Sequence, residues 1–305
     1  MKNEQSAKRI LKGIMKIIIS IFICILIVYA LSLSFTYNIW KNARYLLNSE
    51  NRKIYAAVCK NIDFMQYKLN TLEISSGEND SYIQVNLKKK FLPVIYYPFI
   101  ILSKPEPYSD IDKMFKMYEE LSGNEKPASV SVYDTFPDGR IMHEYRLHDG
   151  SLFIDGDVVN SKICYAVKTA MSYSYITGLS MRGTSFYSLP EELPENYSIK
   201  YLDCHIPVNH SNINISSFKG LQSLELRVYG HKEYGECFDL DFINDFPELK
   251  TLTLHWNYDN FDISDETKYF GIQKLILYTD THTTGDAKIL HEVFPNAEIE
   301  VRTNI

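Results

Sequence analysis

The stretch Leu221-Gln-Ser-Leu224-Glu-Leu226 decides the fold, because its spacing of apolar residues occurs six times in the last part of the chain. Two residues separate the first and second apolar positions, and one residue separates the second and third. The other full copies are Ile176-Thr-Gly-Leu179-Ser-Met181, Ile199-Lys-Tyr-Leu202-Asp-Cys204, Leu249-Lys-Thr-Leu252-Thr-Leu254 and Ile272-Gln-Lys-Leu275-Ile-Leu277, and Ala297-Glu-Ile299-Glu-Val301 is one residue shorter. The alternation at the end of each copy predicts a strand with one buried face.

The copies recur every 22 to 28 residues, and the pattern resembles a leucine-rich repeat over about residues 174–305. Phe218 and Phe246 stand three positions before the first leucine of their copies, and Phe294 holds the same place in the last copy. The asparagine that the family favours after the strand is present only as Asn257, so the repeats are degenerate. The resemblance implies an α/β solenoid of stacked parallel strands with an exposed binding surface. An ordinary α/β domain with several strands is the alternative.

An N-terminal transmembrane helix is expected over residues 13–35. Residues 17–35 are uncharged and almost wholly apolar, and the length of the run suits a membrane span of about 20 residues. The basic residues before it favour a cytoplasmic N-terminal tail, residues 1–12, and an extracytoplasmic C-terminal domain. We therefore expect a single-pass signal-anchor in the cell membrane, with a cleaved signal peptide as the alternative.

The net charge and the positions of the cysteines limit which partners and which redox chemistry the sequence favours. The net charge of −6 argues against a nucleic-acid partner, which needs a basic patch. Outside the apolar run the cysteines are Cys59, Cys164, Cys204 and Cys237. They could form disulfides in an oxidising compartment, but Cys204 holds a core position of its repeat, which favours small buried hydrophobic residues instead.

The middle of the chain is expected to hold a juxtamembrane region, residues 36–106, and a small α+β region, residues 107–160. Helices are expected over residues 36–60 and from an N-cap at Ser109 to Gly123. Strands are expected over residues 82–87, 129–136, 140–147, 151–154 and 157–159, the last four separated by turns at three Asp-Gly pairs, residues 138–139, 149–150 and 155–156. Residues 91–102 predict either a buried strand or loop or a segment docked on the bilayer. A helix over about residues 161–173 would cap the repeat domain, residues 161–305.

The sequence holds little that indicates catalysis. His143, Glu144 and His148 have the spacing H-E-x-x-x-H rather than the H-E-x-x-H of zinc proteases, and in a strand the two histidines would point to opposite sides. We therefore expect no enzyme, no metal site and no cofactor. An enzyme with its site in residues 60–160 is the less favoured alternative.

If the repeat strands stack in register, the residues between the core positions form three rows on the concave face. The third row, here called the basic row, is basic or aromatic in every copy: Arg182, His205, Arg227, His255, Tyr278 and Arg302. Tyr201, Asp203 and Glu225 lie beside it, and Trp256 follows the fourth strand. These ten residues are the predicted partner-binding set, because arginine and tyrosine are frequent anchors at protein interfaces. The alternative is a solvated ladder in which acids neutralise the basic residues two positions later on the same strand: Asp203 with His205, Glu225 with Arg227 and Glu300 with Arg302.

These patterns predict a membrane-anchored protein that binds another protein outside the cytoplasm through its repeat domain. An immunity-type role, neutralising a secreted toxin, is a narrower form of the same hypothesis and rests on analogy alone.

Overall fold

A computed structural model covers the chain and describes the residues 15–16, 18–27, 49–62, 67–76, 81–89, 108–123, 127–135, 140–156, 161–182, 193–207, 215–229, 240–256, 267–279 and 287–303. The chain divides into two compact units, Met1–Cys59 and Lys60–Ile305, and each is described by itself. In the first unit residues 18–27 are helical. Helix α3 (Ser49–Asn61) starts in this unit and ends two residues beyond it. Ile54 and Val58 of α3, two of the apolar positions expected for a helix here, are buried.

The predicted N-terminal transmembrane helix is wrong as a feature of this structure. Among the described residues, no helix combines the length and the apolar character that a membrane crossing requires. The remainder of the predicted span, including residues 28–35, lies outside the described residues. The extracytoplasmic location of the C-terminal domain stays a prediction.

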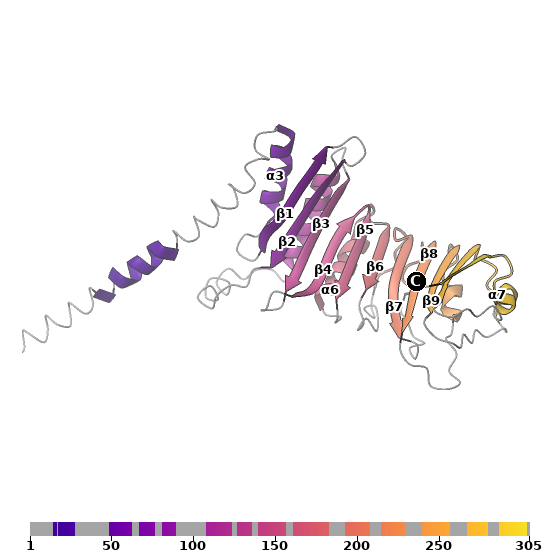
Figure 1. The fold of residues 1–305 in the computed structure, drawn as a ribbon. Coiled ribbons are helices and arrows are strands. Elements are labelled where there is room, and N and C mark those ends of the chain that lie inside the picture. Colours follow the sequence, from indigo (N-terminus) through magenta and orange to yellow (C-terminus); the bar gives the residue numbers. More distant parts are fainter. Residues whose placement is uncertain are drawn as a thin grey trace, which may run out of the picture. The chain divides into compact units, whose positions relative to one another are not determined.

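The second unit is built on one mixed sheet of eleven strands in sequence order (Figure 1). The strands are β1 (Tyr67–Ser76), β2 (Ser81–Lys89), β3 (Ala128–Thr135), β4 (Ile141–His148), β5 (Ser151–Gly156), β6 (Gly178–Arg182), β7 (Tyr201–Pro207), β8 (Ser223–Tyr229), β9 (Thr251–Trp256), β10 (Lys274–Thr279) and β11 (Glu298–Thr303). Strands β5 to β11 are parallel, β2 is parallel to β3, and the remaining neighbours are antiparallel.

The predicted division into a small α+β region and a separate repeat solenoid is wrong, because a single row of apolar residues crosses all eleven strands. Residues paired in register from β1 to β11 are Leu72, Val85, Val130, Leu147, Leu152, Leu179, Leu202, Leu224, Leu252, Leu275 and Ile299. All but Ile299 are buried. The repeat spacing therefore marks only the parallel part of a longer sheet that shares one core.

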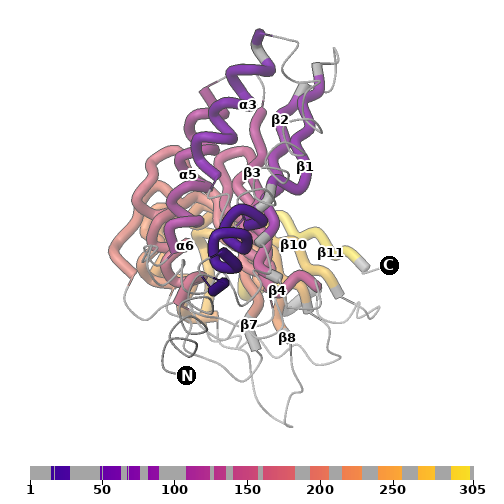
Figure 2. The backbone as a smooth tube through the Cα atoms, turned by 90° about the vertical axis from the view of Figure 1, so that its left-hand side faces the viewer, coloured from indigo at the N-terminus to yellow at the C-terminus, as the bar shows by residue number. Residues whose placement is uncertain are grey.

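Helices α5 (Ser109–Ser122) and α6 (Ser161–Ser172) contact β3, β4 and β5 and lie together on one side of the strands (Figure 2). The predicted apolar faces of both helices are buried. Helix α6 connects the parallel strands β5 and β6, so it does not cap an open end as expected. Ser109 is the first residue of α5, and the N-cap is Tyr108 at φ 63°. The later connections include a 3₁₀ helix, η2 (Asp241–Asp245), and α7 (Ala287–Val293).

The Asp-Gly pairs have different structural roles. Asp149 and Gly150 both have positive φ and form the two-residue turn between β4 and β5, which confirms the predicted turn. Asp155 and Gly156 are instead the end of β5, and the predicted turn there is wrong. A Cβ atom on Gly156 would lie 2.1 Å from the ring of His143, so this glycine makes room for a buried side chain on the neighbouring strand. The pair at residues 138–139, the strand predicted over residues 157–159 and the segment 91–102 lie outside the described residues.

Candidate functional site

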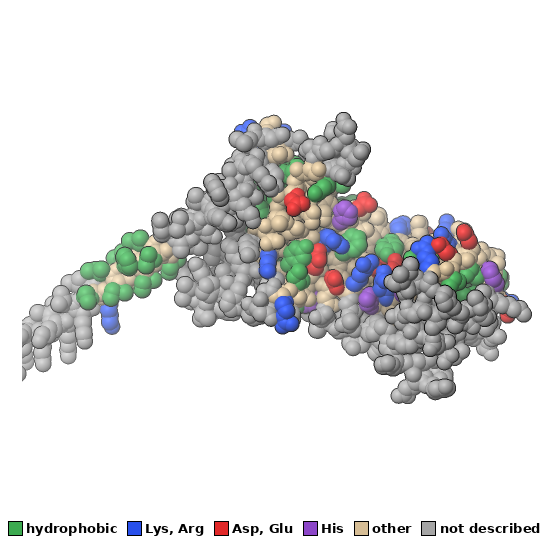
Figure 3. All heavy atoms as spheres, in the orientation of Figure 1, with side chains coloured by type: hydrophobic (Ala, Val, Ile, Leu, Met, Phe, Trp, Pro, Cys, Tyr) green, Lys and Arg blue, Asp and Glu red, His purple; other side chains and the backbone are tan. Residues whose placement is uncertain are grey.

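The predicted register of the repeat strands is confirmed by the strand pairing. His205, Arg227, His255, Tyr278 and Arg302 are paired in turn from β7 to β11, and Arg182 on β6 pairs with Asp155 on β5. The sheet face that carries this row, here called the open face, is opposite to the buried leucine row. Acidic, basic and histidine side chains gather on it over the strands (Figure 3).

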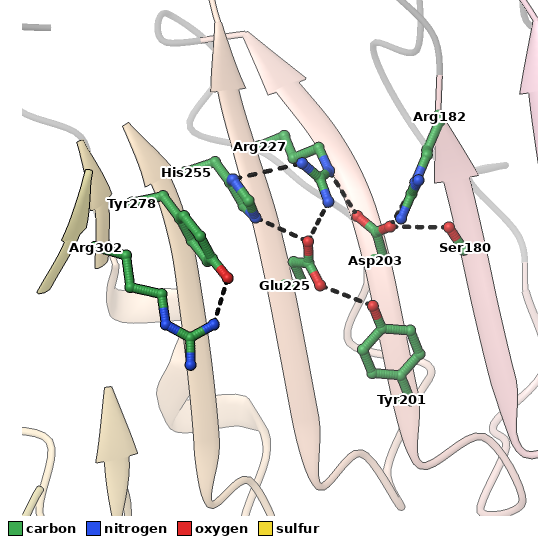
Figure 4. Close-up of polar contacts among 9 residues, drawn as sticks. All are labelled: Ser180, Arg182, Tyr201, Asp203, Glu225, Arg227, His255, Tyr278 and Arg302. Carbon is green, nitrogen blue, oxygen red and sulfur yellow. Dashed lines mark hydrogen bonds and ion pairs between the residues drawn. The ribbon is translucent and has the colours of Figure 1, made fainter. Parts of the chain in front are cut away.

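Asp203 is the centre of the polar contacts on the open face. Its side chain has 0 % exposure, although the residues paired with it on β6 and β8, Ser180 and Glu225, are polar. Ser180 Oγ donates to Oδ2 at 2.9 Å, Arg182 Nε donates to the same oxygen at 2.9 Å, and Arg227 Nε contacts Oδ1 at 3.3 Å. Of the three same-strand pairs that the ladder hypothesis predicts, Glu225 with Arg227 and Glu300 with Arg302 are present. The hydrogen-bond partners of Asp203 come instead from the neighbouring strands β6 and β8 (Figure 4).

Glu225 on β8 joins side chains of β7, β8 and β9. It accepts a hydrogen bond from the hydroxyl of Tyr201 at 2.8 Å, lies 2.8 Å from Nε2 of His255, and forms an ion pair with Nη2 of Arg227. The hydrogen bond with His255 is the largest influence on its pKa. Together with Tyr201 and Arg227 it outweighs burial and lowers the pKa of Glu225 to about 2. Burial, the charge of Asp203 and the contact with Glu225 raise the pKa of Tyr201 well above its usual value.

A stack of side chains continues this network towards β11. The rings of His255 and Tyr278 are parallel within 1°, with centroids 4.3 Å apart. The guanidinium of Arg302 lies over the Tyr278 ring at 5.4 Å and also donates to the Tyr278 hydroxyl. Glu300, two residues earlier on the same strand, accepts from Arg302 Nε at 2.8 Å. The side chains of His255, Tyr278 and Arg302 are therefore held in fixed orientations along the basic row.

The remaining predicted residues have less defined roles. Burial and the charge of Arg227 lower the pKa of His205. The backbone of Trp256 pairs with Val228 and Thr279, and its side chain lies outside the described part of the structure. Thr253 lies between two core leucines of its copy, so the alternation of apolar and polar residues predicts that it faces solvent. It is only 8 % exposed, so the middle of the open face is more buried than the sequence suggested. Ser180 was not predicted as a site residue, although the predicted register places it beside Asp203.

A second charged cluster lies on the other face of the sheet, within residues 60–160 and α6. Lys162 Nζ pairs with the carboxylates of Asp110 and Asp134, at 2.8 Å from the latter, and Tyr67 contacts the same carboxylates. Burial raises the pKa of Asp110, but the charge and hydrogen bond of Lys162 outweigh it and lower the pKa overall. Burial and the two acidic charges raise the pKa of Tyr67 far above its usual value. Sequence patterns missed this cluster, because its members come from β1, α5, β3 and α6.

The described part of the chain contains no cluster of metal ligands, and its cysteines are free thiols. Within these segments, no group of three or more histidine, cysteine, aspartate or glutamate side chains could hold a metal ion. His143 and His148 of the H-E-x-x-x-H stretch lie on opposite faces of β4, the first buried and the second exposed. Cys59, Cys164 and Cys204 are free thiols whose pKa values are raised by burial, and Cys237 lies outside the described residues.

Comparisons with known proteins add no family to this geometry. No protein-family model, no curated protein and no solved structure matches the chain. The resemblance to leucine-rich repeats therefore stays a prediction from the sequence. A function for the chain has to be inferred from the residues of the open face.

Proposed function

We propose that the chain is a protein-binding protein and that the open face, centred on Asp203 and Glu225, is its contact surface. The observation that carries the proposal is the burial of Asp203 under two arginines from neighbouring strands. A fully buried carboxylate on a sheet face is costly unless it is paired, and its pairing fixes Arg182 and Arg227 in one orientation. Side chains that are fixed before binding lose little conformational entropy when a partner docks.

The composition of the open face supports a binding role. Arginine and tyrosine are enriched at the energetic centres of protein interfaces, and the basic row has three arginines and one tyrosine on six adjacent strands. The two helices α5 and α6 pack against β3, β4 and β5 on the face opposite to these polar groups. Ser180 donates its hydroxyl hydrogen to Asp203, an arrangement that holds the carboxylate and does not activate the hydroxyl as a nucleophile.

Site-specific photo-crosslinking tests the proposal. A photoreactive residue replaces Tyr278 on the open face in one variant and Lys116, an exposed residue of α5, in a control. We expect a specific covalent adduct from position 278 and none from position 116, and mass spectrometry identifies the captured protein. A purified partner that crosslinks at position 116 but not at 278 would move the contact surface to the helical side. If the captured protein is a secreted toxin, the immunity-type role is favoured over general recognition.

The alternative of an enzyme has one specific observation in its favour. Tyr67, Asp110, Asp134 and Lys162 converge, and the pKa values of Tyr67 and Asp110 are shifted, in the region where such a site was expected. Lys162 and Asp110 have side chains that are each 11 % exposed, and the four groups contact one another. A cluster that satisfies its own charges in this way favours a structural role, so the binding hypothesis is preferred.

A further inference from the structure

We infer that the partner docks an acidic segment of protein, carrying separated carboxylates, along the basic row of the open face. This inference rests on the proposed function and names the chemistry of the partner. It commits to a protein segment with discrete acidic side chains, and the contacts to be tested are those of Arg182 and Arg302.

The first reason is the depth of the charges. On β6 to β8 the acids point inwards and the bases outwards: Asp203 has 0 % side-chain exposure, whereas Arg182 has 51 % and Arg227 has 28 %. A partner that approaches this part of the face meets guanidinium groups before it meets carboxylates. The face is thus basic at its surface, although acids lie beneath it.

The second reason is the donor capacity of Arg182. A guanidinium has five N–H donors, and the contact of Arg182 with Asp203 uses Nε. The Nη donors are not used in that contact and have the planar fork that matches a carboxylate. The hydrogen bond and charge of Asp203 outweigh burial and raise the pKa of Arg182, so its positive charge is secure.

The third reason is the spacing along the row. Neighbouring strands lie about 4.8 Å apart, so Arg182 on β6 and Arg227 on β8 are about 10 Å apart, and Arg302 on β11 is about 14 Å further. An extended peptide advances about 3.3 Å per residue, so acidic residues three or four positions apart match these intervals. Tyr278, stacked on His255 between the arginines, offers a rigid aromatic surface in the same row.

The distribution of acids on the same face favours a protein over a nucleic acid. Glu144 and Asp155 continue the basic row on β4 and β5, and Glu300 is paired with Arg302 at the other end. A phosphate backbone carries a charge at every nucleotide and would be repelled by these groups and by the net charge of −6. Separated carboxylates can meet Arg182 and Arg227 away from the acids of β4 and β5, and at Arg302 a carboxylate would share the guanidinium with Glu300.

The test uses the full chain and a labelled peptide in which glutamate recurs at every third position among serine and glycine. The matched probes are the same peptide with glutamine for glutamate, a lysine peptide and a single-stranded DNA of equal negative charge. The variants are Arg182→Gln, Arg302→Gln and the control Arg146→Gln, whose guanidinium lies over Phe153 on the same face but outside the basic row. Thermal melting of each variant establishes that it is folded.

We expect the glutamate peptide to bind, with an affinity that falls as salt is added, and the glutamine and lysine peptides not to bind. Each of Arg182→Gln and Arg302→Gln is expected to weaken binding at least about three-fold, and Arg146→Gln to leave it unchanged. No binding of the glutamate peptide, equal loss in the Arg146→Gln variant, or tighter binding of the DNA would overturn the inference. A partner that crosslinks at position 278 yet binds the Arg182→Gln and Arg302→Gln variants normally would keep the contact surface and remove its acidic specificity. A partner that crosslinks only at position 116 would remove both.

Discussion

Arg227 Nε lies 3.3 Å from Asp203 Oδ1, and this contact joins an arginine of the basic row to a carboxylate that solvent does not reach. The same guanidinium reaches Glu225 through Nη2 and His255 through Nη1. Arg227 therefore serves the folded state as well as the surface. The sequence pattern, which places it next to a core position on a solvated row, suggests a side chain whose loss leaves stability unchanged.

We predict that Arg227→Ala lowers the free energy of unfolding by about 1–3 kcal/mol, because it leaves a buried carboxylate with fewer donors. Urea denaturation at neutral pH measures the loss. The control is Arg146→Ala on β4, an exposed arginine of the same face, which should change stability by less than about 0.5 kcal/mol. Equal stability of the two variants would mean that Asp203 does not depend on Arg227.

The contribution of Glu225 to the free energy of unfolding should depend on pH in the acidic range. Its pKa is lowered to about 2 in the folded state, below the value near 4.3 expected for an unfolded chain. A group with a depressed folded pKa contributes stability that is present above the unfolded pKa and is lost as the pH falls towards the folded one. The loss should therefore occur between about pH 4.5 and pH 2 and amount to about 1–3 kcal/mol.

Denaturant unfolding across that pH range, in wild type and in Glu225→Gln, isolates this contribution. The wild-type free energy should fall more steeply with decreasing pH than that of the variant, because glutamine cannot take up the proton. Glu292→Gln, at an exposed position near the C-terminal end of α7, should retain the wild-type slope. Parallel slopes for wild type and Glu225→Gln would show that His255, Tyr201 and Arg227 do not hold the carboxylate in its charged form.

The sequence predicted the individual strands of the repeat part because, within each strand, apolar residues that are buried alternate with residues on the opposite face. Leu224, Leu252 and Leu275 are paired neighbours, as their positions in the copies required. The extent of the sheet was not predicted. In β1 the buried residues Tyr67 and Leu69 are followed by Leu72, because the register shifts between Leu69 and Thr71. Such a bulge breaks the period of two on which strand recognition depends.

The sequence predicted the members of the candidate site and two pairs within single strands, Glu225 with Arg227 and Glu300 with Arg302, but it did not predict the contacts between strands. The rows followed from alternation, but the partners of Asp203 lie 21 and 24 residues away in the sequence, on β6 and β8. Ion pairs between strands depend on rotamers and on burial, which single-sequence patterns do not carry. For the same reason the burial of Thr253 was missed, since alternation tells which face a residue is on and not how deeply it lies under its neighbours.

The contact between Gly156 and His143 gives a prediction about the continuity of the sheet. Gly156→Ala should destabilise the fold by about 1–3 kcal/mol, because the new Cβ would overlap a buried ring on β4. In the His143→Ala background the same substitution should cost much less, since the ring is gone. A double-mutant cycle in urea measures the coupling. Additive effects would mean that β4 and β5 are not paired in the register described.

The buried cluster around Lys162 gives a last prediction, which also separates a structural role from a catalytic one. Lys162→Met removes the cation between Asp110 and Asp134 and leaves two carboxylates facing each other away from water. The expected loss at neutral pH is about 3–5 kcal/mol, the range for breaking a buried ion pair. Without the lysine, burial should raise the folded pKa of Asp110 above that of the unfolded chain, so the variant should regain stability relative to wild type as the pH falls from about 7 to 5.

Two further variants make this test specific. Lys168→Met, at an exposed position of the same helix, should leave stability unchanged within about 0.5 kcal/mol. Adding Asp110→Asn to Lys162→Met should recover part of the loss, because one of the two repelling charges is removed while the hydrogen bond with Tyr67 is kept. If Lys162→Met unfolds like Lys168→Met, the cluster does not hold α5 and α6 on the sheet. Its buried charges would then need a functional reason, and the enzyme hypothesis for residues 60–160 would gain over the binding one.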